Sequence, residues 1–242
     1  MRQTRRLLIG MLSVGTVAAS PRPLSGQSAP STAYEAAVGA KRDTSLRIVV
    51  SIARRRLWVI DGAHDTLRSA SVAVGSERSL AYGAQHWSFQ TPRGIRTVLA
   101  KEEHPVWIPP DWHYVETARR EGLKLVWLHG DTSIDLHDGS SLVMRGTSVR
   151  VEDDTSYEEF EIGEHIIVGS RLFVPPIGSD NRRVPGELGP FRLLLGDGVG
   201  IHGTPDLASV GRATTHGCMR LRDEDITWLY EHVPVGTRVY IF

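Results

Sequence analysis

The sequence of 242 residues contains one cysteine, Cys218, and carries no net charge at neutral pH. A single cysteine cannot form a disulfide within the chain, which excludes the small disulfide-stabilised scaffolds of many secreted proteins. The balance of 28 basic and 28 acidic residues gives no overall basic field, so nucleic acid is not expected as a partner. Aromatic residues are sparse, at 7%. What remains is an ordinary globular composition, 40% hydrophobic and long enough to bury a substantial core.

The first 26 residues have the pattern of a secretory signal peptide. A basic segment, MRQTRR, precedes an apolar stretch at residues 7–19, which is shorter than the roughly 20 residues that span a bilayer. Small residues at Ala19 and Gly26 offer cleavage positions. The alternative is a buried N-terminal helix. We therefore predict an exported chain, in the periplasm or cell wall, whose only membrane contact is through the uncleaved signal segment.

Residues 27–45 are poor in large apolar side chains and are predicted to form a linker. From residue 46 onward, short alternating segments separated by turn residues predict a mostly β fold with one or two short helices. The regular alternation of strand and helix that builds a parallel sheet is missing. Strands are expected at residues 48–52, 57–60, 67–74, 95–100, 192–196, 198–204 and 237–242, and helices at 113–123 and 222–233.

The stretch GIHGTPDLASVGRATTHGCMRL, residues 200–221, places Cys218 near two histidines, His202 and His216. Cysteine acts as a nucleophile when a nearby base or cation promotes its thiolate. His202, at the end of an expected strand, is a candidate for that base. Gly217 permits unusual backbone angles, and the N–H groups of Cys218 and Gly217 could hold an oxyanion. Two alternatives compete: an inert buried thiol, and a zinc site formed by His202, His216 and Cys218.

Several segments of the chain resemble the L,D-transpeptidase family, the YkuD catalytic domain. The family signature is a His-Gly pair followed, after a loop, by Ser/Thr-His-Gly-Cys-x-Arg/Asn. Here these motifs are His202-Gly203 and residues 215–220. The stretches RIVVSIARRRLWVIDG, TPRGIRTVLAKEEHPVWIPP and DITWLYEHVPVGTRVYIF also resemble family segments, so residues 46–242 are expected to form the catalytic domain. The chain departs from the family in a long segment around residues 114–173, which we interpret as an insertion that reshapes the substrate cleft.

The resemblance implies a β-sandwich or barrel-like YkuD fold without a metal or cofactor. It also implies roles for single residues. Cys218 is the expected nucleophile, and His202 is the expected base, oriented by the carbonyl of Gly203. His216 and Gly217 are expected to support the thiolate and the oxyanion. The expected substrate-binding residues are Arg220, Thr215 and Arg212.

The resemblance further implies that the partner is a peptidoglycan stem peptide. Cys218 would attack the third residue of a tetrapeptide stem, release D-alanine and form a thioester. An amine of a second stem would then give a 3→3 cross-link. Water as the acceptor would make the protein an L,D-carboxypeptidase instead. A wall-binding module without catalysis is the alternative from another class. Carbapenem-type inhibitors are expected to acylate Cys218.

Overall fold

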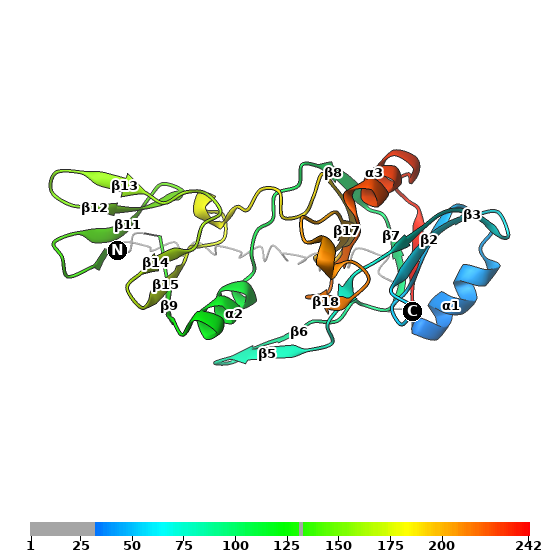
Figure 1. Cartoon of the computed structure of the whole chain (residues 1–242), viewed down its shortest axis with the longest axis horizontal. Helices are drawn as coiled ribbons and strands as arrows, with labels where there is room; N and C mark the ends of the chain where they lie inside the picture. Colours follow the sequence, from blue (N-terminus) through cyan, green and yellow to red (C-terminus); the bar gives the residue numbers. More distant parts are fainter. Residues whose placement is uncertain (1–31, 131–132) are drawn as a thin grey trace, which may run out of the picture.

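The computed structural model describes residues 32–130 and 133–242, so the expected signal peptide lies outside the described residues. Within these ranges the chain forms twenty strands, three α-helices and two short 3-10 helices, a mostly β fold as predicted. The molecule is elongated, with two lobes at opposite ends of its long axis (Figure 1). We call residues 107–184 the inserted lobe, because an antiparallel bridge between Trp107 and Val184 closes it at its base. The remaining described residues form the main lobe.

The main lobe contains two sheets that share one hydrophobic core. The first has the strand order β3-β2-β1-β20-β7, and the second has the order β19-β17-β16-β8. Apolar side chains from both sheets meet in one cluster with Ile226 and Leu229 of helix α3, Asp223–His232. The strands of the first sheet are β1 Arg47–Ser51, β2 Arg56–Asp61, β3 Asp65–Ser71, β7 Gly94–Thr97 and β20 Arg238–Ile241. Those of the second are β8 Ala100–Glu103, β16 Phe191–Gly196, β17 Val199–His202 and β19 Met219–Arg220.

The predicted linker at residues 27–45 is wrong over most of its described part. Helix α1, Ala33–Arg42, begins with a capping box between Thr32 and Glu35. It packs on the first sheet with small residues, and a Cβ on Gly39 would lie 2.7 Å from the ring of Tyr240. Its alanines and glycine allow this close approach but give little of the apolar periodicity by which a helix is recognised. The described part of the chain therefore contains three α-helices where one or two were predicted.

The inserted lobe has its own hydrophobic core, which includes Leu142, Ile166 and Phe173. It contains a four-stranded sheet with the order β10-β11-β12-β13 and a three-stranded sheet with the order β14-β15-β9. Most of residues 114–173, expected as an insertion, lie in these elements. They are α2 Asp111–Glu121, β9 Lys124–Trp127, β10 Ser133–Asp135, β11 Ser141–Arg145, β12 Ser148–Glu152, β13 Tyr157–Glu159, β14 Ile166–Val168 and β15 Arg171–Val174.

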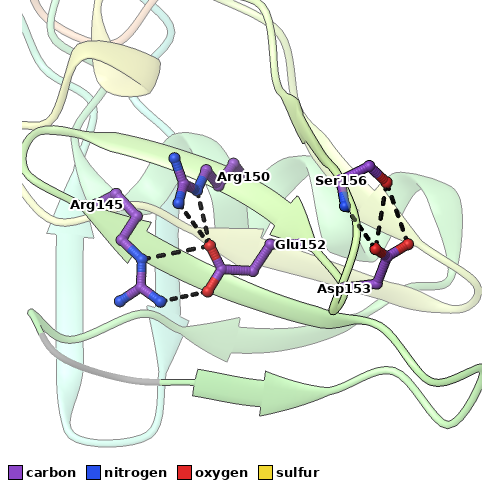
Figure 2. A network of polar contacts seen from close by, with 5 residues as sticks. All are labelled: Arg145, Arg150, Glu152, Asp153 and Ser156. Atoms are coloured by element: carbon purple, nitrogen blue, oxygen red, sulfur yellow. Dashed lines mark hydrogen bonds and ion pairs between the residues drawn. The ribbon is translucent and has the colours of Figure 1, made fainter.

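A polar network closes the end of strand β12 (Figure 2). Glu152 accepts hydrogen bonds from Arg145 of the neighbouring strand β11 and from Arg150. Asp153 accepts from the backbone N–H groups of Thr155 and Ser156, each at 2.7 Å. These bonds lower the pKa of Asp153 to about 2. The ionised carboxylate therefore holds the turn that leads into β13.

Helix α2 is fixed to the inserted lobe by the buried guanidinium of Arg182. Arg182 donates to the Pro109 carbonyl at 2.7 Å and to the Asp111 carboxylate at 2.5 Å. Its guanidinium also lies over the ring of Tyr114. The helix has no side-chain cap at its N-terminus, so the Asp111 carboxylate in its first turn is both a partner of Arg182 and a favourable charge for the helix dipole.

A hairpin of the main lobe, β5 Ser79–Tyr82 and β6 Gln85–Ser88, reaches helix α2. Leu80 and Phe89 pack with Val115 and Trp112 of α2 in one apolar cluster. This contact holds α2 against the main lobe (Figure 1). None of the helices in residues 32–130 and 133–242 is long and apolar enough to cross a membrane.

Candidate active site

The signature residues lie on the second sheet and on the loop that leads to its edge strand. Strands β17 and β19 pair in parallel, with Ile201 beside Met219 and His202 beside Arg220. Ile201 and Met219 are fully buried in the main core. Because side chains alternate between the faces of a strand, His202 and Arg220 project from the opposite face. Continuing the register one position back brings Cys218 beside Gly200, on the same face as His202.

Four polar side chains form a row across the whole second sheet. Glu102 of β8 pairs with Arg192 of β16, Arg192 pairs with His202 of β17, and His202 pairs with Arg220 of β19. Arg192 is held by Glu102, with its Nε 2.8 Å from Oε2. The imidazole of His202 therefore lies between two guanidinium groups. Arg192 and Glu102 were not identified from the sequence, because the strand register that aligns them is not visible in it.

The tautomer of His202 follows from its backbone contact. Its Nδ1 lies 2.6 Å from the carbonyl oxygen of Gly203, the contact expected from the sequence. A carbonyl only accepts, so Nδ1 carries the proton and Nε2 keeps its lone pair. Burial, with smaller contributions from Arg220 and Arg192, lowers the pKa of this imidazole to about 4. His202 is therefore a neutral proton acceptor at pH 7.

Cys218 is half-buried, and its Sγ lies 3.6 Å from the Gly198 carbonyl oxygen. Burial raises the pKa of the thiol above its ordinary value, while Arg192 and Arg220 act in the opposite direction. This differs from the expectation that a neighbouring imidazole keeps the sulfur ionised. In the resting structure both the thiol and the His202 imidazole are neutral, because burial disfavours the charged form of each.

The loop before Cys218 is held by two threonine hydroxyls. The Thr215 hydroxyl donates to the Cys218 carbonyl at 2.6 Å and accepts from the Gly217 N–H at 3.2 Å. The Thr91 hydroxyl donates to the Gly217 carbonyl at 2.9 Å and accepts from the Gly75 N–H at 2.8 Å. Gly217 has a φ of 132°, and a Cβ there would lie 3.1 Å from the Gln90 carbonyl oxygen. The loop is thus held through both backbone groups of Gly217, its N–H by Thr215 and its carbonyl by Thr91.

These bonds correct two roles expected from the sequence. Thr215, expected to bind substrate, is buried and uses its hydroxyl within the loop. The Gly217 N–H, expected to share in an oxyanion hole, donates to Thr215 instead. The Cys218 N–H remains as the candidate oxyanion donor. Thr91 was not identified as a site residue from the sequence. It lies in the TPRG stretch that resembles the family, and this resemblance was the signal that could have pointed to it.

His216 contacts the inserted lobe. Its Nε2 lies 2.8 Å from Oε2 of Glu116, and its ring stacks on Trp112 with centroids 3.7 Å apart. The Phe89 ring packs against the same imidazole in a T-shaped arrangement. Burial lowers the pKa of His216, and the hydrogen bond to Glu116 opposes that shift. His216 is thus held by α2, and neither Glu116 nor Trp112 was identified from the sequence.

The two expected arginines have different surroundings. Arg220 projects from the same sheet face as Cys218 and His202, and its ion pair with Asp206 is long, at 3.9 Å. Among the described residues, its Nε is one of two buried side-chain nitrogen or oxygen atoms without a hydrogen-bond partner. Arg212 is exposed on the loop before β18, Ala213–Thr215. Arg220 thus belongs to the row that contains His202, whereas Arg212 lies outside that row on an exposed loop.

The zinc alternative is not supported by the grouping of side chains. Within residues 32–130 and 133–242, no three histidine, cysteine, aspartate or glutamate side chains are close enough to share a metal ion. His202 and His216 each have another partner, Gly203 and Glu116 respectively. His202, His216 and Cys218 therefore do not form the three-ligand set considered from the sequence.

The main lobe is thus a mostly β domain that carries histidine and cysteine on one sheet face. A family model, the L,D-transpeptidase catalytic domain YkuD, matches residues 45–241. The chain belongs to this family. The "Probable L,D-transpeptidase ErfK/SrfK" of Salmonella typhimurium is 26% identical over 195 residues, which are 80% of this chain and 43% of that protein. The "Probable L,D-transpeptidase YbiS" of Escherichia coli K12 is 47% identical over 66 residues, 27% of this chain and 20% of that protein. The chain thus spans less than half the length of both relatives.

Solved structures of L,D-transpeptidases are also similar to this chain. The enzyme of Xylanimonas cellulosilytica, residues 123–326, has 12% identity and a TM-score of 0.42, covering 83% of this chain and 62% of that one. L,D-transpeptidase 3 of Mycobacterium tuberculosis, in complex with a faropenem-derived adduct, has 17% identity and a TM-score of 0.40, covering 81% of this chain and 60% of that one.

Proposed function

We propose that the protein is an exported cysteine L,D-transpeptidase that acts on peptidoglycan stem peptides. Membership of the family supports the reaction class. The observation that carries the proposal for this chain is the hydrogen bond from His202 Nδ1 to the Gly203 carbonyl. It leaves the Nε2 lone pair available on the sheet face to which Cys218 belongs, which is what a general base for a thiol requires.

The first half of the reaction forms a thioester. Cys218 Sγ attacks the carbonyl carbon of the third stem residue, and its proton passes to His202 Nε2. The Cys218 N–H donates to the oxyanion of the tetrahedral intermediate. The intermediate collapses when the C–N bond breaks, and His202 returns its proton to the departing amine of D-alanine. Because the resting thiol and imidazole are both neutral, the proton has to pass from Sγ to His202 Nε2 in the course of acylation.

The second half transfers the acyl group. The amine of a second stem attacks the thioester carbon and gives a proton to His202. Sγ leaves, takes up that proton, and a new amide joins the two stems. The positive charges of Arg192 and Arg220 stabilise the departing thiolate. The Arg220 guanidinium, which is partly exposed on the face that carries Cys218, is the donor we assign to the substrate.

Mass spectrometry of products tests this proposal. The protein lacking residues 1–26 is incubated with tetrapeptide muropeptides, and D-alanine release and 3→3 cross-linked dimers are expected. Release of D-alanine without dimers would indicate an L,D-carboxypeptidase, in which water is the acceptor. Activity that survives Cys218→Ala would refute the assigned nucleophile. A carbapenem is expected to add covalently to Cys218, and an unchanged intact mass after long exposure would contradict this.

Export is a separate part of the proposal, supported by the basic and apolar pattern of residues 1–26. N-terminal sequencing of the protein recovered from the periplasm or cell wall should begin after Ala19 or Gly26. Recovery of the intact N-terminus from the cytoplasm alone would contradict export.

A further inference from the structure

A cleft of about 400 Å³ lies between the β5–β6 hairpin of the main lobe and helix α2 of the inserted lobe. The apolar side chains of Leu80 and Phe89 line it, and both are buried in the cluster that joins the hairpin to α2. Three arginines also line it: Arg78 from the hairpin, and Arg119 and Arg120 from α2. The volume is within the range of sites that bind small ligands or a few residues of a peptide.

The cleft adjoins the loop that carries the signature cysteine. Two of its lining residues, Phe89 and Glu116, contact the imidazole of His216 directly. Arg78 also acts on the same imidazole through its charge. His216 is two residues before Cys218 in the sequence. A ligand in the cleft therefore lies beside the residues that fix the Cys218 loop.

The lining of the cleft carries more positive than negative charge, which favours an anionic ligand. Among the described residues that line it, Glu116 is the only acidic one, and its Oε2 already accepts from His216. Each arginine has a local contact: Arg78 with the Ser76 hydroxyl, Arg119 with the Ala81 carbonyl and Arg120 with Glu121. These contacts use one N–H of each guanidinium, which has five donors. The remaining donors suit carboxylates, which guanidinium groups bind in a planar, often bidentate geometry.

We propose that this cleft binds free carboxylate groups of the peptide substrate and so holds the stem next to Cys218. The inference rests on the proposed function and extends it, because it names the part of the substrate that the cleft recognises. It also gives the inserted lobe a role: α2 supplies two of the three arginines and the glutamate. The backbone of the stem contributes no charge, so amidation of its carboxyl groups removes the feature that the cleft recognises.

A binding experiment tests the inference without requiring turnover. The Cys218→Ala protein is titrated with a stem tetrapeptide that carries free carboxylates and, separately, with the same peptide amidated at those groups. The free acid should bind about three- to tenfold more tightly, as expected for a few exposed ion pairs, and its advantage should shrink as salt is added. The double substitution Arg78→Gln and Arg120→Gln should remove this advantage and leave the affinity for the amide unchanged. Arg145→Gln, on strand β11 of the inserted lobe, is the matched control and should change neither affinity.

Equal binding of acid and amide by the Cys218→Ala protein overturns the inference, as does a double variant that keeps the preference for the acid. The comparison of two ligands on one protein needs no substitution in the cleft, so equal binding overturns the inference even where the double variant fails to fold. Failure of the proposed function has a different signature, namely a chain with Cys218 intact that releases no D-alanine. In that active chain, separate KM values for donor and acceptor stems distinguish which of the two the cleft holds.

Discussion

His216, in the loop before Cys218, and Glu116, on the inserted helix α2, share a hydrogen bond of 2.8 Å although 100 residues separate them in the sequence. Trp112, which is also on α2, stacks on the face of the same imidazole. The inserted lobe therefore does more than extend the molecule. One of its helices holds a residue of the family signature in place.

Glu116→Gln should lower the pKa of His216 further. Burial already lowers it, and the carboxylate of Glu116 is the main group that raises it. The neutral amide keeps a hydrogen bond but removes the charge, so the imidazolium loses its stabilisation. Titration of the His216 ring protons by NMR measures this directly. Trp112→Phe is the control: it keeps the carboxylate and can only reduce the burial of the ring, so it should not lower the His216 pKa. An unchanged His216 pKa in Glu116→Gln would mean that the contact is absent in solution.

Stability should fall as the pH drops from about 6.5 to about 4. His202 has its pKa lowered to about 4 in the folded protein from an unfolded value of 6.5. The unfolded chain thus binds a proton in this window that the folded chain does not, which favours unfolding as the pH falls. The loss from this one buried group is up to about 3 kcal/mol. Urea unfolding at pH 7.5, 5.5 and 4.5 measures it, with His202→Gln as the control that should lose less stability over the same range.

Alkylation of Cys218 by a small thiol reagent should show a midpoint above that of free cysteine. Burial raises the thiol pKa, and the nearby guanidinium of Arg192 lowers it. Arg192→Gln should therefore move the alkylation midpoint to still higher pH. Arg56→Gln, on the exposed face of β2, is a control that should leave it unchanged. A midpoint below that of free cysteine would instead indicate a resting thiolate and contradict the neutral pair.

Thr91→Val should destabilise the protein by about 1–3 kcal/mol, because it leaves the buried Gly75 N–H without its acceptor and the Gly217 carbonyl without its donor. The effect should also slow acylation of Cys218, since Gly217 precedes it. Thr91→Ser retains the hydroxyl and should lose much less on both measures. Urea unfolding and the rate of carbapenem labelling are the two measurements. If valine and serine behave alike, the hydroxyl is not what fixes the loop.

The sequence predicted the elements that carry strong local signals. Strands β16 and β17 and helix α3 lie where apolar alternation, a Gly-Asp-Gly turn and an acidic first turn indicated them. Helix α1 was missed because its buried face is made of alanine, which adds little apolar periodicity.

The site was predictable only where its residues are close in the sequence. Cys218, His202 and Gly203 belong to recognisable motifs. Arg192 and Glu102 join them through strand register, and Glu116 joins them through the packing of a separate lobe. The protonation states of Cys218 and His202 could not be predicted from the sequence either, because their pKa values depend on burial, which neither motif encodes.

The base of the inserted lobe joins strands that are neighbours in the second sheet. β8 ends at Glu103, β16 begins at Phe191, and these two residues are paired. Topologically the whole lobe is therefore one very long hairpin connection, which can lengthen or shorten during evolution at small entropic expense and without disturbing the sheet. The contact between α2 and His216 limits that freedom, because a shorter connection without α2 would remove the hydrogen bond and the stacking that hold His216.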